Sequence, residues 1–368
     1  MSGESFHKLN RPIKIVHIVS SLDKVNFGVW NAAFFGAPFL KRKYNLDTLC
    51  WVCRPQDPND PKLQFPVTYL EKGNSGRALR KLAKEQGLDP GNTVLVSHGC
   101  WLTPSRVGYA LQRSGYRWIH VPHGMLEPWS LKQGRLKKMI YFRLREKRYI
   151  MRADRVRAVS RVEKDNLEKQ LGRDVVLVEN GVVMPQGSTT KDTHEAVFLF
   201  MARLHYKKGI VPLVRAWRRV MGDETNKMLA IAGPDEGELE KIRPWLTRNI
   251  RYIGAVYGSE KTEWLARAHY YFLPSHSEGF PTSVLEAMSY GLIPLISRGC
   301  NFPQVFDEAL GWRAEPDEEQ LTELLTRLKT MPYDTTLSER NRKYIASHYA
   351  EEVIGEEMYK LYASLLTE

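Results

Sequence analysis

The stretch "SEGFPTSVLEAMSYG", residues 277–291, holds two glutamates, Glu278 and Glu286, separated by a turn and by the predicted start of a helix. Two interpretations of these carboxylates are open. In the first, Ser283 and Glu286 form a capping box, in which the glutamate side chain bonds back to the backbone N–H of the cap residue. In the second, both carboxylates bind one ligand. The rest of the chain has to decide between them.

The composition is that of a globular protein with two domains. A chain of 368 residues with 43% hydrophobic and 26% charged residues is long enough for two cores. No apolar run reaches the roughly 18 residues of a membrane-spanning helix, and residues 1–14 lack the apolar core of a signal peptide. Four cysteines make no disulfide framework. Cys50 and Cys53 are predicted to be a buried, reduced pair in a strand. A cytoplasmic protein is therefore expected.

The net charge of +12 is concentrated in one segment. Residues 129–161 contain twelve Lys or Arg and two acids, which gives +10. Such a run is commonly a solvated helix face, but its size favours an anionic partner: nucleic acid, a phosphate-bearing substrate or a membrane surface. Leu136, Ile140 and Leu144 fall at helical spacing among the cations, as in a helix that lies on a membrane surface.

Short β-branched runs alternate with helical patterns along the whole chain, which predicts parallel sheets with crossover helices. A polar stretch without periodicity, residues 186–196, separates two series of such runs. The predicted fold class is therefore α/β, with two tandem Rossmann-like domains facing each other across a cleft. Ligands of such domains bind at the carboxyl ends of the strands. The predicted strands are 13–22, 46–53, 93–99, 117–124, 155–160 and 175–182, then 197–204, 227–233, 250–256, 270–276 and 292–297.

Several polar residues follow these strands directly. In "MARLHYKKG", Arg203 ends a strand and Lys208 precedes a helix, and two such cations can neutralise a diphosphate, although two solvated surface cations are the simpler interpretation. Gly28 follows the first strand as a single glycine, so no G-x-G-x-x-G dinucleotide fingerprint is present. His120 and His123 face opposite ways if both lie in a strand, and no Cys or His partner has ligand spacing, so no metal site is predicted. His123, at the strand end, is the histidine placed to meet a ligand.

Together these motifs resemble the GT-B-fold, retaining glycosyltransferases of glycosyltransferase family 4, also called group 1. The most specific element is E-x7-E after P-S-x-x-E-G-F, in "PSHSEGFPTSVLEAMSYGLIPLIS". "NFGVWN", "SHGCW", "HVPHGMLEPWSLKQGRLKK", "VENGVV", "ARLHYKKG" and "IGAVYG" extend the resemblance over nearly the whole chain. Two departures are the single glycine of the first turn and Gln304, where relatives more often carry Glu.

The resemblance implies roles for individual residues. Arg203 and Lys208 would hold the donor diphosphate, Glu278 the donor sugar and Glu286 the two ribose hydroxyls. His123 would sit at the sugar near the reacting centre, so the implied catalytic residues are His123, Glu278, Arg203 and Lys208. The remaining donor-binding positions that it implies are Gly28, Val256, Gly279, Phe280, Pro281, Thr282 and Ser283.

The resemblance also implies the reaction. It predicts a retaining, metal-independent hexosyltransferase without a cofactor, in which the departing phosphate acts as base toward the acceptor. The donor is a UDP- or GDP-sugar, and the acceptor is a saccharide, in particular one linked to a polyprenyl diphosphate, in surface-polysaccharide biosynthesis. Residues 129–161 would then bind the anionic inner face of the membrane, and no nucleic acid is expected. The alternative is a nucleotide-sugar 2-epimerase of the same fold.

The resemblance divides the chain as well. An acceptor-side domain spans residues 1–185 and is completed by a C-terminal helix, 350–368, while a nucleotide-sugar-binding domain spans 186–349.

Overall fold

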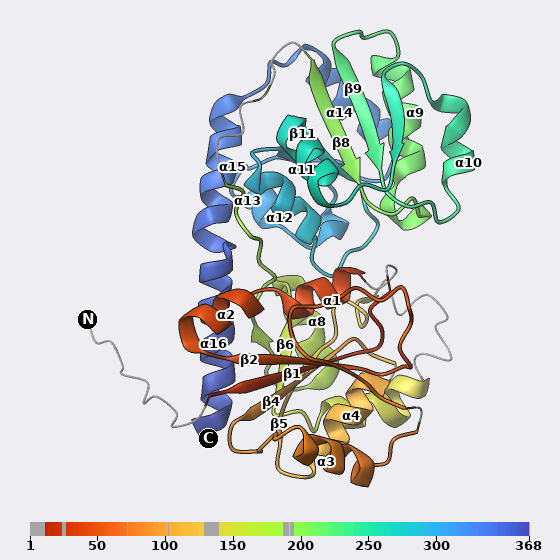
Figure 1. Ribbon diagram of the computed structural model, residues 1–368. Helices are drawn as coiled ribbons and strands as arrows, with labels where there is room; N and C mark the ends of the chain where they lie inside the picture. The colour runs from red at the N-terminus through yellow and green to blue at the C-terminus, as the bar shows by residue number, and fades with distance from the viewer. Residues whose placement is uncertain are drawn as a thin grey trace. The chain divides into compact units, whose positions relative to one another are not determined.

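The computed structural model describes residues 12–23, 27–71, 73–101, 103–128, 140–186, 191 and 195–367. The chain forms two compact units, one of residues 1–180 with 351–368 and one of residues 181–350. The predicted boundaries, 185/186 and 349/350, lie close to these. Each unit is a parallel α/β sheet covered by helices (Figure 1).

The first unit is built on a seven-stranded sheet with the order β3-β2-β1-β4-β5-β6-β7. Its central strands are apolar runs, and β4 is buried at every position, as a strand covered on both faces must be. The last strand is shorter than its sequence suggests, and just beyond it the carbonyl of Val178 accepts from the Arg157 guanidinium (2.8 Å). The strands are β1 (Lys14–Val19), β2 (Asp47–Val52), β3 (Val67–Tyr69), β4 (Thr93–His98), β5 (Arg117–Val121), β6 (Arg155–Ala158) and β7 (Val176–Leu177).

Helices cover both faces of this sheet. Trp118 of β5 and Val16 of β1 pack with residues of α3 and α4 on one face, whereas Val19 and Cys50 pack with α1 on the other. The helices are α1 (Phe27–Phe34), α2 (Ala37–Tyr44), α3 (Gly76–Glu85), α4 (Thr103–Gln112), the π-helical turn η2 (Phe142–Glu146), α7 (Lys147–Ile150), α8 (Arg161–Leu171) and α16 (Glu351–Thr367).

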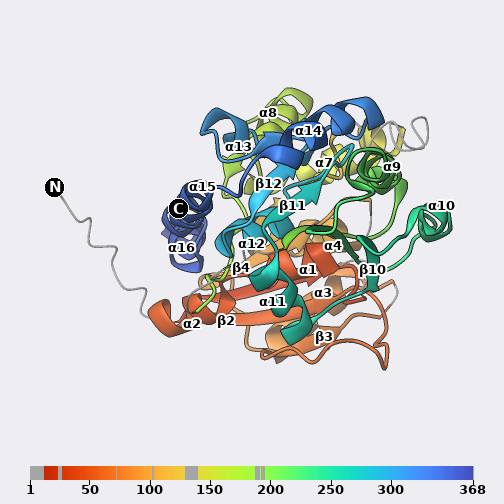
Figure 2. The same cartoon turned by 90° about the horizontal axis from the view of Figure 1, so that it is seen from above.

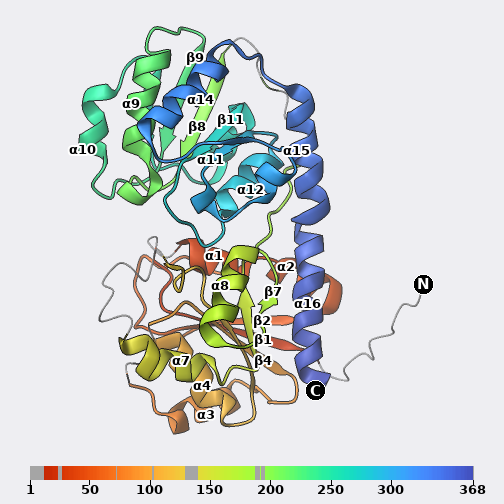
Figure 3. The same ribbon diagram turned by 180° about the vertical axis from the view of Figure 1, so that it is seen from behind.

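The C-terminal helix α16 packs along α2 within this unit (Figure 3). Gly355 makes the approach possible, since a Cβ there would lie 2.4 Å from Cδ1 of Phe39. The rings of Tyr44 and Tyr359 stack with centroids 3.6 Å apart. The helix predicted over residues 350–368 is therefore formed, and its apolar face is buried in the first unit.

The second unit has a six-stranded sheet with the order β10-β9-β8-β11-β12-β13. All five strands predicted for this half are present, and the two-residue β13 is the one that the sequence did not indicate. α10 lies beside α9 on the outside of this unit (Figures 1 and 2). The strands are β8 (Ala196–Met201), β9 (Lys227–Ala232), β10 (Ile250–Gly254), β11 (Tyr270–Leu273), β12 (Ile293–Ile296) and β13 (Trp312–Arg313).

The core of the second unit lies between the sheet and the paired helices α9 and α14. The rings of Phe198 and Trp217 meet edge to face with centroids 5.0 Å apart, and both side chains are fully buried. No described helix is long and apolar enough to cross a membrane. The helices and turns are η3 (Tyr206–Lys208), α9 (Ile210–Met221), α10 (Leu239–Ile242), η4 (Arg243–Trp245), α11 (Gly258–Arg267), α12 (Thr282–Ser289), η5 (Arg298–Cys300), α13 (Gln304–Asp307), α14 (Glu318–Thr330) and α15 (Thr335–His348).

Candidate functional site

The carboxyl edge of the second sheet carries two paired cations. Arg203 follows β8, and its Nη1 donates to both carboxylate oxygens of Glu236, each at 2.7 Å. Lys208 lies in the η3 turn, and its Nζ lies 2.6 Å from Oε1 of Glu278. Gly209 lets this turn approach the end of β11, because a Cβ there would lie 2.1 Å from the carbonyl oxygen of Pro274. The fold therefore brings the two predicted cations to one edge.

Glu278 is the most closely held carboxylate of this edge. Oε1 accepts from Ser275 as well as from Lys208, and its side chain is only 13% exposed. Its backbone N–H donates to Gly299 (2.7 Å), and its carbonyl accepts from Asn301 (2.7 Å). Burial acts to raise the pKa of Glu278, but Lys208, Ser275 and Lys207 together outweigh it, so the pKa lies below its ordinary value. The carboxylate is thus charged and fixed in direction.

Glu286 does not cap its helix. α12 begins at Thr282 with Pro281 as the preceding cap residue, and no side chain bonds to the free N–H groups there. The capping-box interpretation of Ser283 and Glu286 was therefore wrong, since the helix begins before Ser283. The Glu286 carboxylate instead lies 2.6 Å from Nζ of Lys261 on α11, and both side chains are roughly a third exposed. It is available to a ligand from the solvent side.

The other predicted donor positions of this unit fall between the same elements. Phe280 is buried and packs edge to face on Phe302, with centroids 5.4 Å apart. Val256 is buried between β10 and α11. Gly279, Pro281, Thr282 and Ser283 form the connection from β11 into the first turn of α12. Their roles as donor contacts stay predictions.

Sequence reasoning missed Glu236, the partner of Arg203. It lies in the loop "GPDEGELEKIR" after β9, where the sequence predicted the end of the strand 227–233 but singled out no residue. Gln304, the departure from the family pattern, begins α13, and its Oε1 is buried without a hydrogen-bond partner among the described residues.

The first unit presents a chain of hydrogen-bonded histidines from the neighbouring strands β1 and β4 and from the turn that follows β5. Nδ1 of His17 lies 2.9 Å from Nε2 of His98, and Nδ1 of His98 lies 2.8 Å from Nε2 of His123. Burial, with a smaller contribution from the Arg157 guanidinium, lowers the pKa of His17 and of His123 to about 3. A neutral imidazole has one donor nitrogen and one acceptor nitrogen. In a row of three such rings, both hydrogen bonds must therefore run in the same direction along the row. The tautomer of His123 is thereby tied to those of its two neighbours.

His123 does not lie in a strand. β5 ends at Val121, and His123 has φ +55°, in the left-handed region that only a tight turn imposes on a histidine. The predicted strand 117–124 was three residues too long, because the chain turns at Pro122 and His123. Gly28, the other predicted residue of this unit, lies exposed in the first turn of α1, and residues 24–26 before it lie outside the described residues.

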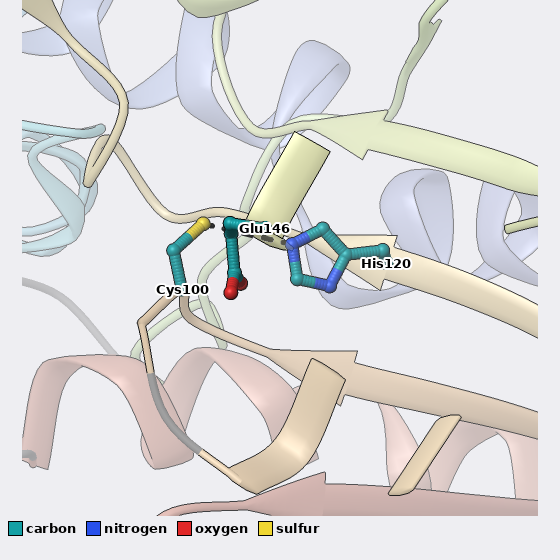
Figure 4. A group of neighbouring side chains, drawn as sticks. All are labelled: Cys100, His120 and Glu146. Carbon is teal, nitrogen blue, oxygen red and sulfur yellow. Dashed lines mark hydrogen bonds between the residues drawn. The ribbon is translucent and has the colours of Figure 1, made fainter. Parts of the chain in front are cut away.

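His120 faces the opposite side of the sheet from the three hydrogen-bonded histidines. It lies beside two residues whose spacing in the sequence did not predict a shared site. Figure 4 shows Cys100, His120 and Glu146 together, coming from the end of β4, from β5 and from η2. Burial raises the pKa of the Cys100 thiol and of Glu146 and lowers that of His120 to about 3. Cys50 and Cys53 are both free thiols, the first buried and the second half-buried at the end of β2.

Only part of the basic segment 129–161 can be placed. Residues 129–139, with Leu136 among them, lie outside the described residues. Ile140 is 49% and Leu144 63% exposed, whereas Glu146 and Ile150 are buried. The exposed basic side chains on this segment are Arg143, Arg145, Arg148, Arg152 and Arg161.

Comparison with protein families covers both units. The family model "Glycosyltransferase Family 4" matches residues 39–184, and "Glycosyl transferases group 1" matches residues 186–348. The chain belongs to the group 1, family 4 glycosyltransferases. Its fold is GT-B: the crystal structure of Anabaena Alr3699/HepE in complex with UDP and glucose superposes with a TM-score of 0.72 over 96% of this chain and 100% of that one, at 15% identity.

Two curated relatives match this chain over only part of its length and of theirs. The chain is 27% identical over 173 residues to the phosphatidylinositol N-acetylglucosaminyltransferase gpi3 subunit of Schizosaccharomyces pombe, which is 46% of this glycosyltransferase and 38% of that protein. It is 28% identical over 171 residues to the N,N'-diacetylbacillosaminyl-diphospho-undecaprenol alpha-1,3-N-acetylgalactosaminyltransferase of Campylobacter jejuni, 45% of this chain and 44% of that one. The chain thus spans less than half the length of either relative.

Proposed function

We propose that this glycosyltransferase moves a hexose from a UDP- or GDP-sugar to a lipid-linked saccharide, with retention of configuration, in surface-polysaccharide biosynthesis. The observation that carries the proposal is the carboxyl edge of the second sheet, where Arg203 and Lys208 are held by Glu236 and Glu278. Two fixed cations on the one loop that follows β8 have the charge and the spacing along the chain to bind a diphosphate.

The leaving group explains why the reaction needs these cations. A nucleoside diphosphate gathers negative charge as the glycosidic bond breaks, so fixed positive charge stabilises the transition state more than the ground state. Arg203 offers a fork of N–H groups to phosphate oxygens, and Lys208 offers a point charge. With both in place the diphosphate is neutralised by the chain itself, and we expect turnover without a metal ion at this site.

The two glutamates bind the sugar and the ribose of the donor. When a diphosphate takes up the charge of Lys208, the Glu278 carboxylate is released to accept hydrogen bonds from sugar hydroxyls. Glu286 accepts from the two ribose hydroxyls after exchanging Lys261 for them. Val256 then lies beside the nucleobase. The donor is thus bound by carboxylates at its diols and by cations at its phosphates.

His123 is proposed to act at the sugar, near the reacting centre, as a neutral group. Its hydrogen bond to His98 fixes the ring, and its lowered pKa keeps it uncharged at neutral pH. Retention is then explained by front-face attack, with the departing phosphate taking the acceptor proton. That route needs no second carboxylate on the far side of the anomeric carbon, unlike a double displacement.

A lipid-linked acceptor is supported by the relatives and by the basic segment. The names of the Schizosaccharomyces pombe and Campylobacter jejuni proteins specify a phosphatidylinositol and a diphospho-undecaprenol acceptor. On this chain Ile140, Leu144 and Met151 expose apolar side chains within a run of arginines. Apolar groups beside cations suit the headgroup region of an anionic membrane, where each cation contributes about 1 kcal/mol. We propose that this segment holds the protein at the inner face of the membrane.

The experiment that tests the function is a panel of UDP- and GDP-sugars incubated with the enzyme and a polyprenyl-diphosphate-linked saccharide. Release of nucleoside diphosphate that depends on the acceptor, with a product of the donor's anomeric configuration by NMR, is expected for one donor. Turnover of a nucleotide sugar to its 2-epimer without acceptor would instead identify an epimerase. An inverted anomer would refute retention.

Membrane binding is tested separately by flotation with vesicles of phosphatidylcholine and an anionic phospholipid. Replacing Arg143, Arg145 and Arg148 by Gln should release the protein from anionic vesicles and leave its melting temperature unchanged, because all three are exposed. The matched control replaces three exposed arginines of the second unit, namely Arg218, Arg248 and Arg251. Equal binding of both variants and the parent would refute the membrane contact.

A further inference from the structure

The cluster of Cys100, His120 and Glu146 takes no part in the proposed transfer, yet it gathers three metal-binding atoms in the core of the first unit. One ligand atom from each residue lies within 4.8 Å of the other two (Figure 4). Their exposed fractions are 1%, 0% and 0%. Buried polar groups normally have hydrogen-bond partners, but Oε2 of Glu146 has none among the described residues. The Glu146 carboxylate, to which the Ser105 side chain also hydrogen-bonds, thus keeps one oxygen without a partner in the described part of the chain, beside a thiol and an imidazole.

The separation of the two softer ligands fits one ion. Sγ of Cys100 and Nε2 of His120 are 3.6 Å apart. On a tetrahedral zinc ion, bonds of about 2.3 Å to sulfur and about 2.0–2.1 Å to nitrogen place the two ligand atoms about 3.6 Å apart. The carboxylate of Glu146 reaches the same centre after a shift of roughly 1 Å, since zinc holds its ligand atoms within about 3.4–3.6 Å of each other.

A second layer of hydrogen bonds orients two of the ligands. Nδ1 of His120 lies 2.9 Å from Oγ of Ser97, which also accepts from the indole of Trp118. Oγ has two lone pairs, so Nδ1–H can donate to it, and Nε2 is then left as an acceptor on the side of Cys100. Oε1 of Glu146 accepts from the backbone N–H of Trp101 (3.2 Å). Metal ligands commonly have hydrogen-bond partners of this kind, because the partners fix the tautomer of a histidine ligand and the orientation of each ligand side chain.

We propose that Cys100, His120 and Glu146 bind a divalent ion of the zinc class through Sγ, Nε2 and the carboxylate. A thiolate and a carboxylate bring two negative charges, which the dication neutralises in a medium that tolerates no net charge. Binding releases the thiol proton to solvent. Sulfur and imidazole nitrogen select zinc or a neighbouring transition ion over magnesium and calcium, which take oxygen ligands.

The ion has a structural consequence for the basic segment. Cys100 follows β4 and His120 lies in β5, whereas Glu146 ends the η2 turn, which contains Leu144 and follows Ile140. The ion therefore ties the exposed segment to the centre of the sheet. Because the three ligands are almost completely buried, the ion is bound as the unit folds and exchanges slowly. The site is independent of the proposed transfer and of its donor.

Metal content tests the proposal directly. The protein is purified from zinc-supplemented medium, freed of loosely bound ions by gel filtration and analysed by mass spectrometry for metal per chain. About one zinc per chain is expected in the parent, and less than a tenth of that in Cys100→Ser. Cys300→Ser, which removes another fully buried thiol, is the matched control and should retain the zinc.

Cobalt substitution supplies a second readout if Cys100→Ser folds poorly. The parent refolded with Co²⁺ should gain a sulfur-to-cobalt charge-transfer band, and Glu146→Gln should keep the band with weakened affinity. A parent that carries no stoichiometric metal and shows no such band overturns the proposal. So does a Cys100→Ser variant that binds zinc as the parent does, since the ion would then lie elsewhere.

Discussion

Glu286→Gln separates a ribose ligand from a surface ion pair. The substitution removes the pair with Lys261, whose atoms lie 2.6 Å apart with 27% and 30% of the two side chains exposed. A pair so exposed contributes about 0–1 kcal/mol to stability, so the melting temperature should hardly move. A charged hydrogen bond to a ligand is worth roughly 1.5–3 kcal/mol, and the amide keeps one acceptor and no charge. The affinity for nucleoside diphosphate should therefore fall by about one to two orders of magnitude.

Lys261→Met is the matched control, because it breaks the same ion pair and leaves the carboxylate in place. Calorimetric titration of the parent and of both variants with UDP and GDP, beside their melting curves, gives the comparison. Lys261→Met should bind at least as well as the parent, since its carboxylate has no competing cation. If Glu286→Gln binds like the parent, or if both variants lose the same affinity, the ribose contact is wrong.

Three further substitutions test other parts of the account. Glu278→Gln should lower turnover more than UDP affinity, because its bonds go to the sugar and not to the nucleotide; steady-state kinetics beside calorimetry would show the opposite if it only buttressed Lys208. Gly355→Val should lower the melting temperature by forcing a side chain against Phe39, at a cost of about 1–3 kcal/mol, whereas Gly76→Ala, with room for its Cβ, should not. His17 has a pKa of about 3 in the folded protein. Below about pH 6.5 the unfolded chain therefore binds a proton at this residue that the native state does not bind. The free energy of unfolding then falls as the pH falls toward 3. His17→Asn should reduce this slope by at most one proton, about 1.4 kcal/mol per pH unit, in urea titrations; an unchanged slope would mean that His17 is protonated in the native state.

Much of the fold followed from hydrophobic patterning. The central strands of both sheets are continuous apolar runs. The predicted strand 197–204 overlaps β8 and the predicted strand 270–276 contains β11, because a strand buried on both faces shows no polar alternation. The short edge strands β3 and β13 were missed, since two or three residues carry no periodicity. The ends of the strands were predicted less accurately than their centres. For example, β5 ends at Val121 because the chain turns there.

The gathering of charged residues at the carboxyl edge of the second sheet was predictable because the strand-end loops of a parallel sheet meet at one edge. Arg203, Lys208 and Glu278 are brought together there as the loops suggested. Partners that depend on strand order were not predictable. His17 and His98 come from neighbouring strands that are far apart in the sequence, and Glu146 reaches Cys100 from a π-helical turn.

The central claim is that the carboxyl edge of the second sheet stabilises the leaving diphosphate, and Lys208→Met tests it most directly. Removing one such donor commonly costs about 10²–10³ in turnover. We expect acceptor-dependent release of nucleoside diphosphate to fall by about that factor, with the melting curve measured alongside. Lys227→Met, at the amino end of β9 on the opposite edge of the sheet, should leave the rate unchanged. A Lys208→Met enzyme that turns over at the rate of the parent would contradict the account.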